Sequence, residues 1–533
     1  MTFSYDFGLI YSWLAKIIGS RDFIFDKKNI SALDAANLIC DGDVLAIVGS
    51  GGGILESNKI LRAIEDRFIA TGSPRALTVI HALGIGDGKE LGLNHLAHEG
   101  LVKRVIGGHW SWSPRMQDLA KKNLIEAYAL PTGVISGLLR ESGAKRPGFF
   151  TKVGLRSFID PRKGGGKLNT VTVENIVELV NIQGEEYLHY LPQFVNVGII
   201  RGSTADFSGN ISFEEEPAFL DSFAVALSAR GNGGKVFAQV KKLVSNGEIQ
   251  PYSVHVPCTM SDYIIVNSEQ SQTYQSVYNE NFVTTGTDTS NLQSSLSDLD
   301  TAKLAIVRRA SQEITPSNVV NVGFGVSSSV VDILREKDFL SKIKLVIEQG
   351  SIGGIPVSGN LFGVSNHPDA IIPLTSQFDT FYANIIDVAV LGMGELDVEG
   401  NVNVSQLGGT AIGPGGFIDI VHSAKKIVFC GTFSTKGLLV NFLNDSLEIK
   451  SEGKIIKVVE NVSQITFSAS QALIDGRKAI YITERAVFEL TKQGLALIEI
   501  APGIDPLKDV ISLLPPGVIC DNWRLMPSSV FTK

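Results

Sequence analysis

The stretch Asp41-Gly-Asp-Val-Leu-Ala-Ile-Val-Gly-Ser-Gly-Gly-Gly53 passes from a short apolar run into a glycine loop, and a helical pattern follows from about Ile54 to Ile69. Residues 316–326, Pro-Ser-Asn-Val-Val-Asn-Val-Gly-Phe-Gly-Val, repeat this design and are followed by a second helical pattern over 327–334. A strand that leads through a tight loop into a helix is the building unit of parallel α/β sheets. The chain is therefore predicted to be internally duplicated.

Each half alternates strand-like runs with helix-like stretches, which predicts the α/β class with two similar open α/β/α domains and mainly parallel sheets. The clearest strand-like runs are residues 76–81, 195–201, 263–267 and 388–391. Between the halves the sequence is rich in Ser, Thr, Gln and Asn, which is typical of an exposed linker. The expected organisation is an N-terminal extension (1–25), an N-terminal domain (26–268), a linker (269–300) and a C-terminal domain (301–533).

Composition excludes several classes of protein. A chain of 533 residues with 44% hydrophobic and 19% charged residues is globular and too long for one core. A formal net charge of −8 argues against nucleic-acid binding, which needs a basic surface. No apolar run is long enough for a membrane span, the cysteines form no C-x-x-C pair, and a cytoplasmic location without disulfides is expected. An apolar helical stripe over residues 9–18 docks on the protein's own body, on a membrane surface or on a partner.

A candidate nucleophile stands at the end of another apolar run. Glu348 follows Lys344-Leu-Val-Ile347 and precedes Gln349-Gly-Ser-Ile-Gly-Gly-Ile-Pro356. A carboxylate at the tip of a strand, beside a turn with few side chains, is accessible to the reacting carbon of a ligand. The alternative is a solvated glutamate that only ends a strand.

This E-x-G-x-x-G-x-P segment resembles the active-site segment of the family I coenzyme A transferases, in particular the single-chain acetate and propionate group, and the chain is also similar to succinyl-CoA:3-ketoacid CoA-transferase. The resemblance extends from about Asp41 to about Arg524. It implies an enzyme with its active site at the domain interface, which exchanges CoA between a short-chain acyl-CoA (acetate, propionate or acetoacetate type) and a free carboxylate. Ping-pong kinetics through a glutamyl-CoA thioester at Glu348, no permanently bound cofactor and a homodimer or homotetramer are also implied.

The resemblance also assigns roles to the glycine-rich loops. Backbone amides of Gly51, Gly52 and Gly53 are expected to stabilise oxyanions, and the third loop, expected to precede a strand, to lie against bound CoA. The alternative for each loop is a tight turn without a ligand. The CoA-binding residues implied in this way are Gly323, Phe324, Gly325, Val326, Ser327, Gly353, Gly354, Gly413, Gly415 and Gly416.

One departure from the family pattern affects the acyl pocket. Where the family usually has P-Q-G, this chain has Pro131-Thr132-Gly133. Thr132 can donate a hydrogen bond, but its side chain is shorter than that of Gln, so an acyl-CoA hydrolase on the same fold is the nearest alternative. A non-catalytic acyl-CoA binding protein is the second.

Other chemistries lack their motifs. There is no G-x-S-x-G elbow, no cysteine in a catalytic motif, and neither glycine loop has the dinucleotide-binding spacing. His95 and His98 are three residues apart, but no third ligand clusters with them, so no metal site is expected.

Overall fold

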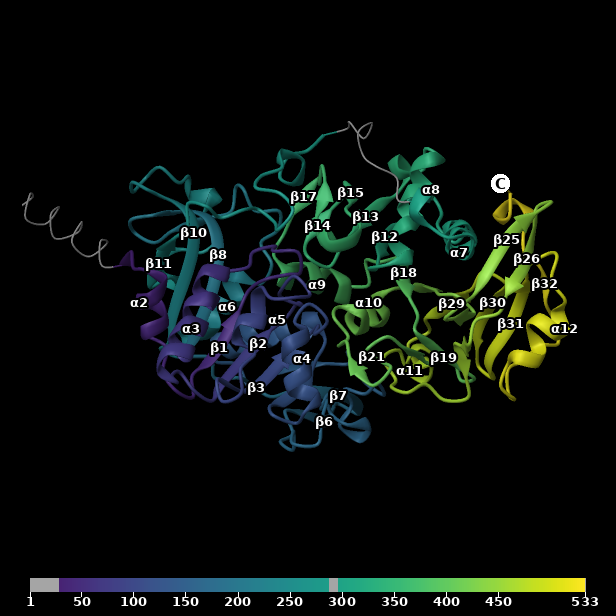
Figure 1. The fold of residues 1–533 in the computed structure, drawn as a ribbon, viewed down its shortest axis with the longest axis horizontal. Helices are drawn as coiled ribbons and strands as arrows, with labels where there is room; N and C mark the ends of the chain where they lie inside the picture. Colours follow the sequence, from purple (N-terminus) through teal and green to yellow (C-terminus); the bar gives the residue numbers. More distant parts are fainter. Residues whose placement is uncertain (1–27, 287–295, 533) are drawn as a thin grey trace, which may run out of the picture.

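The N-terminal half is built on one sheet. A computed structural model describes residues 28–286 and 296–532, so the predicted extension (1–25) and the stripe at 9–18 lie outside the described residues. Seven strands of the sheet are parallel, with a short antiparallel strand β9 (Ile211–Ser212) beside β8. In spatial order the parallel strands are β11 (Tyr263–Val266), β10 (Lys235–Val244), β8 (Val197–Asp206), β1 (Val44–Ile47), β2 (Leu77–His81), β3 (Val102–Gly107) and β4 (Glu126–Ala129) (Figure 1).

The C-terminal half has a second sheet whose five central strands are parallel. Antiparallel strands extend it at both edges. In spatial order the strands are β17 (Ala370–Ile371), β14 (Ser351–Ile352), β13 (Lys344–Val346), β12 (Val319–Val322), β18 (Val388–Gly392), β23 (Lys426–Cys430), β29 (Lys478–Ile482), β30 (Ala486–Thr491), β31 (Gly494–Ile500) and β32 (Arg524–Leu525). Both β1 and β12 lie inside their sheets and lead into a glycine loop, as the duplicated pattern predicted.

Helices connect the parallel strands and confirm the α/β class. They are α2 (Ala32–Asn37), α3 (Asn58–Thr71), α4 (Pro114–Lys121), α5 (Thr132–Gly143), α6 (Ser222–Gly231), α7 (Thr301–Ser311), α8 (Val330–Glu336), α9 (Leu374–Tyr382), α10 (Phe417–Ser423), α11 (Ala469–Ile474) and α12 (Pro506–Asp509). The expected helix at Ile54 begins later, at Asn58, because Ser50 and Ile54 pair with each other across the glycine loop.

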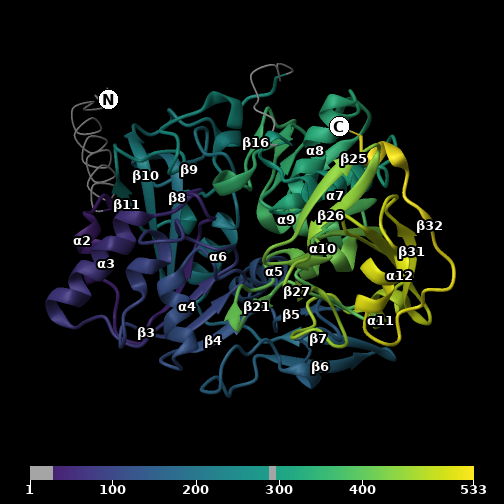
Figure 2. The same cartoon turned by 45° about the vertical axis from the view of Figure 1, so that its right-hand side comes forward.

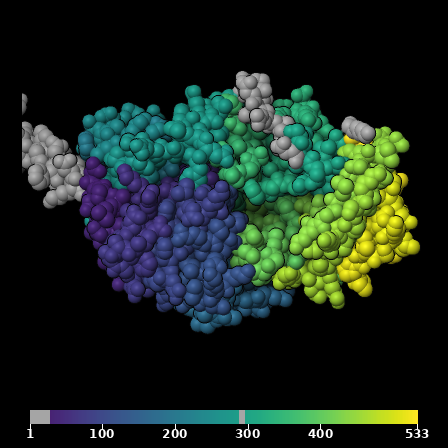
Figure 3. All heavy atoms as spheres, in the orientation of Figure 1, coloured from purple at the N-terminus to yellow at the C-terminus, as the bar shows by residue number. Residues whose placement is uncertain are grey.

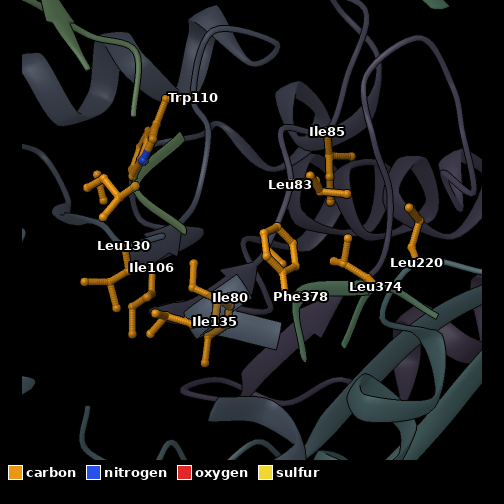
Figure 4. Close-up of a cluster of buried hydrophobic side chains, with 14 of the residues drawn as sticks. Ile80, Leu83, Ile85, Ile106, Trp110, Leu130, Ile135, Leu220, Leu374 and Phe378 are labelled. Carbon is orange, nitrogen blue, oxygen red and sulfur yellow. The ribbon is translucent and has the colours of Figure 1, made fainter. Parts of the chain in front are cut away.

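The two halves share an apolar core at their interface. Phe378 of α9 lies between Leu83 and Ile80 of the N-terminal half, and Leu374 of the same helix lies toward Leu220 (Figure 4). All five side chains are almost completely buried, which favours a fixed interface. Figure 2 shows α5 of the first half close to α9 and α10 of the second, and Figure 3 shows the two halves in contact along their length.

Part of the predicted exposed linker is packed. Gln270, Gln272 and Thr273 are buried, and the Tyr274 hydroxyl donates a hydrogen bond to the Glu56 carboxylate. The prediction of an exposed segment was wrong here because these polar side chains find buried partners, which composition does not reveal. Residues 287–295 lie outside the described residues.

The third glycine loop was also expected to precede a strand, and this was wrong. Helix α10 begins at Phe417, directly after Gly416, and β23 follows it. The apolar positions of this short helix, Ile418, Ile420 and Val421, are buried as they would be in a strand. Seven residues are too few for periodicity to separate the two alternatives.

Candidate active site

A cavity of about 570 Å³ lies between the two halves and contains Glu348. The first glycine loop and the loops after β2 and β3 form one wall. The loops after β12, β13 and β22 (Thr410–Ala411) contribute to the other. The residues that line the cavity include Gly51, Gly84, His109, Ser111, Trp112, Asn321, Gly323, Phe324, Glu348, Gln349, Gly413, Gly415 and Gly416.

Glu348 stands at the tip of a β-hairpin. Strands β13 and β14 are antiparallel with Val346 opposite Ile352, and Ile347 donates its N–H to the carbonyl oxygen of Ser351 at 3.1 Å. The tip residues, Glu348 and Gln349, therefore project beyond the end of the sheet into the cavity. The sequence predicted this placement at a strand end.

The surroundings of Glu348 perturb its carboxyl group. Burial raises its pKa to about 7, although the Gly416 N–H and the Gln349 side chain, whose Nε2 lies 3.3 Å from Oε1, oppose the shift by donating hydrogen bonds. A Cβ at Gly416 would overlap the Glu348 carboxylate, so this position needs glycine for close approach. The result is a partly protonated carboxyl group in a shielded cavity, as a nucleophile or acid/base group requires.

The structure brings together about half of the predicted site residues. Those that line the cavity with Glu348 are Gly51, Gly323, Phe324, Gly413, Gly415 and Gly416. Those that do not line it are Gly52, Gly53, Thr132, Gly325, Val326, Ser327, Gly353 and Gly354.

The amides of Gly52 and Gly53 have other acceptors. Gly52 donates to the carbonyl oxygen of Gly86 at 3.3 Å, and Gly53 donates to the buried Glu56 carboxylate. These interactions hold the loop in shape. In this conformation the two amides do not serve the expected oxyanion role, whereas Gly51 faces the cavity.

Thr132 is a structural residue of the interface. Its Oγ1 donates to the carbonyl oxygen of Ala82 at 2.8 Å, and its N–H donates to that of Gly415 at 2.9 Å. The side chain is fully buried and does not reach the cavity. Thr132 therefore lies outside the cavity in which it was expected to contact the acyl group.

The remaining predicted residues lie away from Glu348. Gly353 and Gly354 pack against Asp369 and Asn366 beside a separate cavity. Gly325 precedes a short 3₁₀ helix (Val326–Ser329), in which Ser327 donates its hydroxyl to the Gly323 carbonyl oxygen at 2.9 Å. In this second loop Gly323 and Phe324 line the cavity, whereas Gly325 and the 3₁₀ helix after it do not.

Comparison with known proteins agrees with this geometry. The family described as coenzyme A transferase matches residues 30–267. The acetate CoA-transferase YdiF of Escherichia coli O157:H7 is 40% identical over 94% of this chain and 94% of its own. The caffeate CoA-transferase of Acetobacterium woodii is 39% identical over 95% of this chain and 98% of its own.

The chain belongs to the coenzyme A transferase family. Crystal structures of the YdiF acyl-CoA transferase, as apoenzyme and as a thioester complex with CoA, both give a TM-score of 0.89 at 38% identity, over 95% and 94% of this chain and 96% of theirs. The protein is therefore an enzyme of the CoA-transferase class, with acyl-CoA and carboxylate substrates.

Sequence reasoning missed much of the cavity wall of this CoA-transferase. His109 was not predicted, because nothing in the spacing of its neighbours indicated a cavity. Trp112 and Asn321 gave no signal. Asn321 lies in β12, where its Nδ2 donates to the Val346 carbonyl oxygen at 3.0 Å.

Two kinds of feature are absent from the part of the chain that the structure describes. No helix in residues 28–286 and 296–532 is long and apolar enough to cross a membrane. Within the same described residues, no group of three or more His, Cys, Asp or Glu side chains is arranged to hold a metal ion. His95 and His98 instead contact the two carboxylate oxygens of Glu65 at 2.5 and 2.6 Å.

Proposed function

We propose that this CoA-transferase exchanges CoA between short-chain acyl-CoA and free carboxylates of the acetate, propionate or acetoacetate type, with Glu348 as the nucleophile. The observation that supports this most is the Glu348 carboxyl group itself, which stands on a hairpin tip inside the interdomain cavity with its pKa raised to about 7. A carboxylate that is poorly stabilised by its surroundings is reactive toward an acyl carbon.

The proposed reaction proceeds in two halves. A Glu348 oxygen attacks the thioester carbonyl carbon, and the C–S bond breaks. CoA departs as the thiolate, and an acyl-glutamyl anhydride remains on the enzyme. The thiolate attacks the glutamyl carbonyl carbon, releasing the first carboxylate and leaving glutamyl-CoA. The acceptor carboxylate then attacks the glutamyl-CoA thioester, and the same steps run in reverse to give the new acyl-CoA. No ATP and no permanently bound cofactor are needed. The kinetics are ping-pong.

Two orphaned acceptors support CoA as the ligand of this cavity. Asn321 Oδ1 and Gln349 Oε1 are buried in its wall and have no hydrogen-bond partner among the described residues. Buried polar atoms are normally paired, so a ligand with N–H groups is expected there. The pantetheine arm of CoA carries amide N–H groups.

The hydrolase and the non-catalytic binding protein receive no comparable support. The hydrolase depended on Thr132 altering the acyl pocket, and its hydroxyl is bound to Ala82 outside the cavity. We further propose that domains 26–268 and 301–533 supply opposite walls of the site. In this proposal Gly325 to Ser327, Gly353 and Gly354 contribute to CoA binding only indirectly. The enzyme is proposed to be a cytoplasmic homodimer or homotetramer without a nucleic-acid partner. The net charge of −8 is consistent with the last point.

Intact-protein mass spectrometry tests the proposal. Wild type incubated with acetyl-CoA or propionyl-CoA is expected to gain the mass of CoA less water, and borohydride to convert this adduct to an alcohol. Glu348→Gln, which keeps the size of the side chain, is expected to form no adduct. If acyl-CoA binds to wild type without any adduct, the nucleophilic role of Glu348 is wrong.

A further inference from the structure

His109 is held beside the loop of residues 412–416 by backbone hydrogen bonds that cross the interface between the two halves. Its neighbour Gly108 accepts from the Gly415 N–H at 2.8 Å, and its other neighbour Trp110 donates to the Ile412 carbonyl oxygen at 2.8 Å. His109 is thereby fixed to the same loop that contacts Glu348. Such preorganisation is what a group acting on a transition state requires.

The imidazole ring and the Glu348 carboxylate face adjacent residues of this loop. A Cβ on Gly415 would lie 3.6 Å from His109 Cδ2, and a Cβ on Gly416 would overlap a Glu348 carboxylate oxygen. Both side chains line one cavity. An acyl group attacked by Glu348 would therefore occupy the cavity that the imidazole also lines.

The ring has a defined orientation. Nδ1 lies 3.3 Å from the Ser111 hydroxyl oxygen and on the side of Gly84, whereas the Cδ2 edge lies toward Gly415. If the Ser111 hydroxyl donates to Nδ1, the proton of a neutral ring is on Nε2. Burial lowers the pKa of His109 to about 4, so the ring is neutral at pH 7 and has one N–H to offer.

Two of the three expected oxyanion donors are engaged elsewhere, which leaves Gly51 as the only one of them that faces the cavity. The Gly52 and Gly53 amides donate to Gly86 and Glu56. We propose that His109 is a catalytic residue that donates a hydrogen bond from Nε2 to the oxygen of the tetrahedral intermediate formed when Glu348 attacks the acyl carbon. The assignment rests on the proposed function. No proton is transferred. The C–O bond to Glu348 forms, and negative charge develops on the carbonyl oxygen. The tetrahedral intermediate then collapses as the C–S bond breaks and the thiolate departs.

The test compares His109→Phe, which keeps a ring without a donor, with His109→Gln, which keeps a donor without the ring. His109→Phe is expected to slow glutamyl-CoA formation from acetyl-CoA about 10²- to 10³-fold, which is the usual effect of removing one oxyanion donor. Calorimetry with CoA is expected to give a Kd within about threefold of wild type, since a merely structural role would weaken binding too. His109→Gln is expected to recover at least about tenfold of the lost rate. His189→Gln, in β7 (Glu185–Tyr190) outside the cavity, is the control.

The outcomes separate this inference from the proposed function. If wild type itself forms no adduct, the proposed function fails and this assignment with it. If wild type reacts and His109→Phe reacts at a similar rate, only this assignment is overturned. Equal defects in His109→Phe and His109→Gln, or a CoA affinity that falls in step with the rate, also overturn it.

Discussion

Asp419 in α10 accepts a hydrogen bond from the backbone N–H of Gly133 at the start of α5, at 3.1 Å. Its other carboxylate oxygen accepts from the Tyr382 hydroxyl at 2.6 Å. The contact joins the two halves directly beside the loop that carries Gly416, next to Glu348. Asp419 is fully buried, so these bonds form without competition from water.

We expect Asp419→Ala to destabilise the enzyme and slow turnover, because it leaves the Gly133 N–H and the Tyr382 hydroxyl buried and unpaired. Each such group costs roughly 1–3 kcal/mol. Asp419→Asn is the matched control, since its one carbonyl oxygen can still accept one of the two hydrogen bonds, and it is expected to lose less stability than Asp419→Ala. Thermal melting and kcat are measured for both variants. Equal melting temperatures for Asp419→Ala and wild type would contradict a joining role.

The raised pKa of Glu348 predicts the pH dependence of the reaction. Only the ionised carboxylate attacks, and its pKa is about 7. The value of kcat/KM is therefore expected to increase about tenfold per pH unit below pH 7 and to level off above it, as the ionised fraction does. Steady-state rates with acetyl-CoA between pH 5 and 9 check this. A profile that is flat down to pH 5 would show that the carboxyl is not perturbed in the free enzyme.

The same shift predicts a stability effect. Because the folded carboxyl, with its pKa near 7, binds a proton more tightly than the unfolded one, with its pKa near 4.5, the stability from this group is present below pH 4.5 and decreases as pH rises to 7. Glu348→Gln is neutral at every pH and avoids the loss. Its melting temperature relative to wild type is expected to be higher at pH 8 than at pH 4.5. A difference that does not change with pH would contradict the prediction.

How far the sequence could predict this site depends on the kind of interaction. Glu348 and the glycine loops were predictable because strand ends and close backbone approach leave a local pattern. The packing of Tyr274 against Glu56, and the hydrogen bond of Thr132 to Ala82, were not. These contacts join residues 218 and 50 positions apart, and only tertiary structure shows that a side chain is satisfied away from the ligand.

Asn321 offers a test of ligand binding apart from chemistry. Asn321 lines the cavity, and its Oδ1 is buried without a partner among the described residues, so we expect this oxygen to accept a hydrogen bond from the pantetheine arm when CoA binds. Asn321→Ala is expected to raise the Kd for CoA about tenfold, equivalent to one ordinary hydrogen bond, with kcat changed less. Calorimetry and saturation kinetics measure the two effects. A loss confined to kcat would place Asn321 at the reacting carbon instead.

Trp112 is expected to limit acyl chain length. A Cβ on Gly51 would overlap its indole ring, and one on Gly84 would lie 2.6 Å from Cδ1, so the ring packs against both backbones and closes the cavity wall. Trp112→Ala removes this wall. Because each buried methylene contributes about 0.8 kcal/mol, we expect the ratio of kcat/KM for hexanoyl-CoA to that for acetyl-CoA to rise at least about tenfold. Trp523→Ala is the control, since Trp523 is 36% exposed and lies outside the cavity. An unchanged ratio in Trp112→Ala, with normal folding, would mean that the acyl chain extends toward another wall.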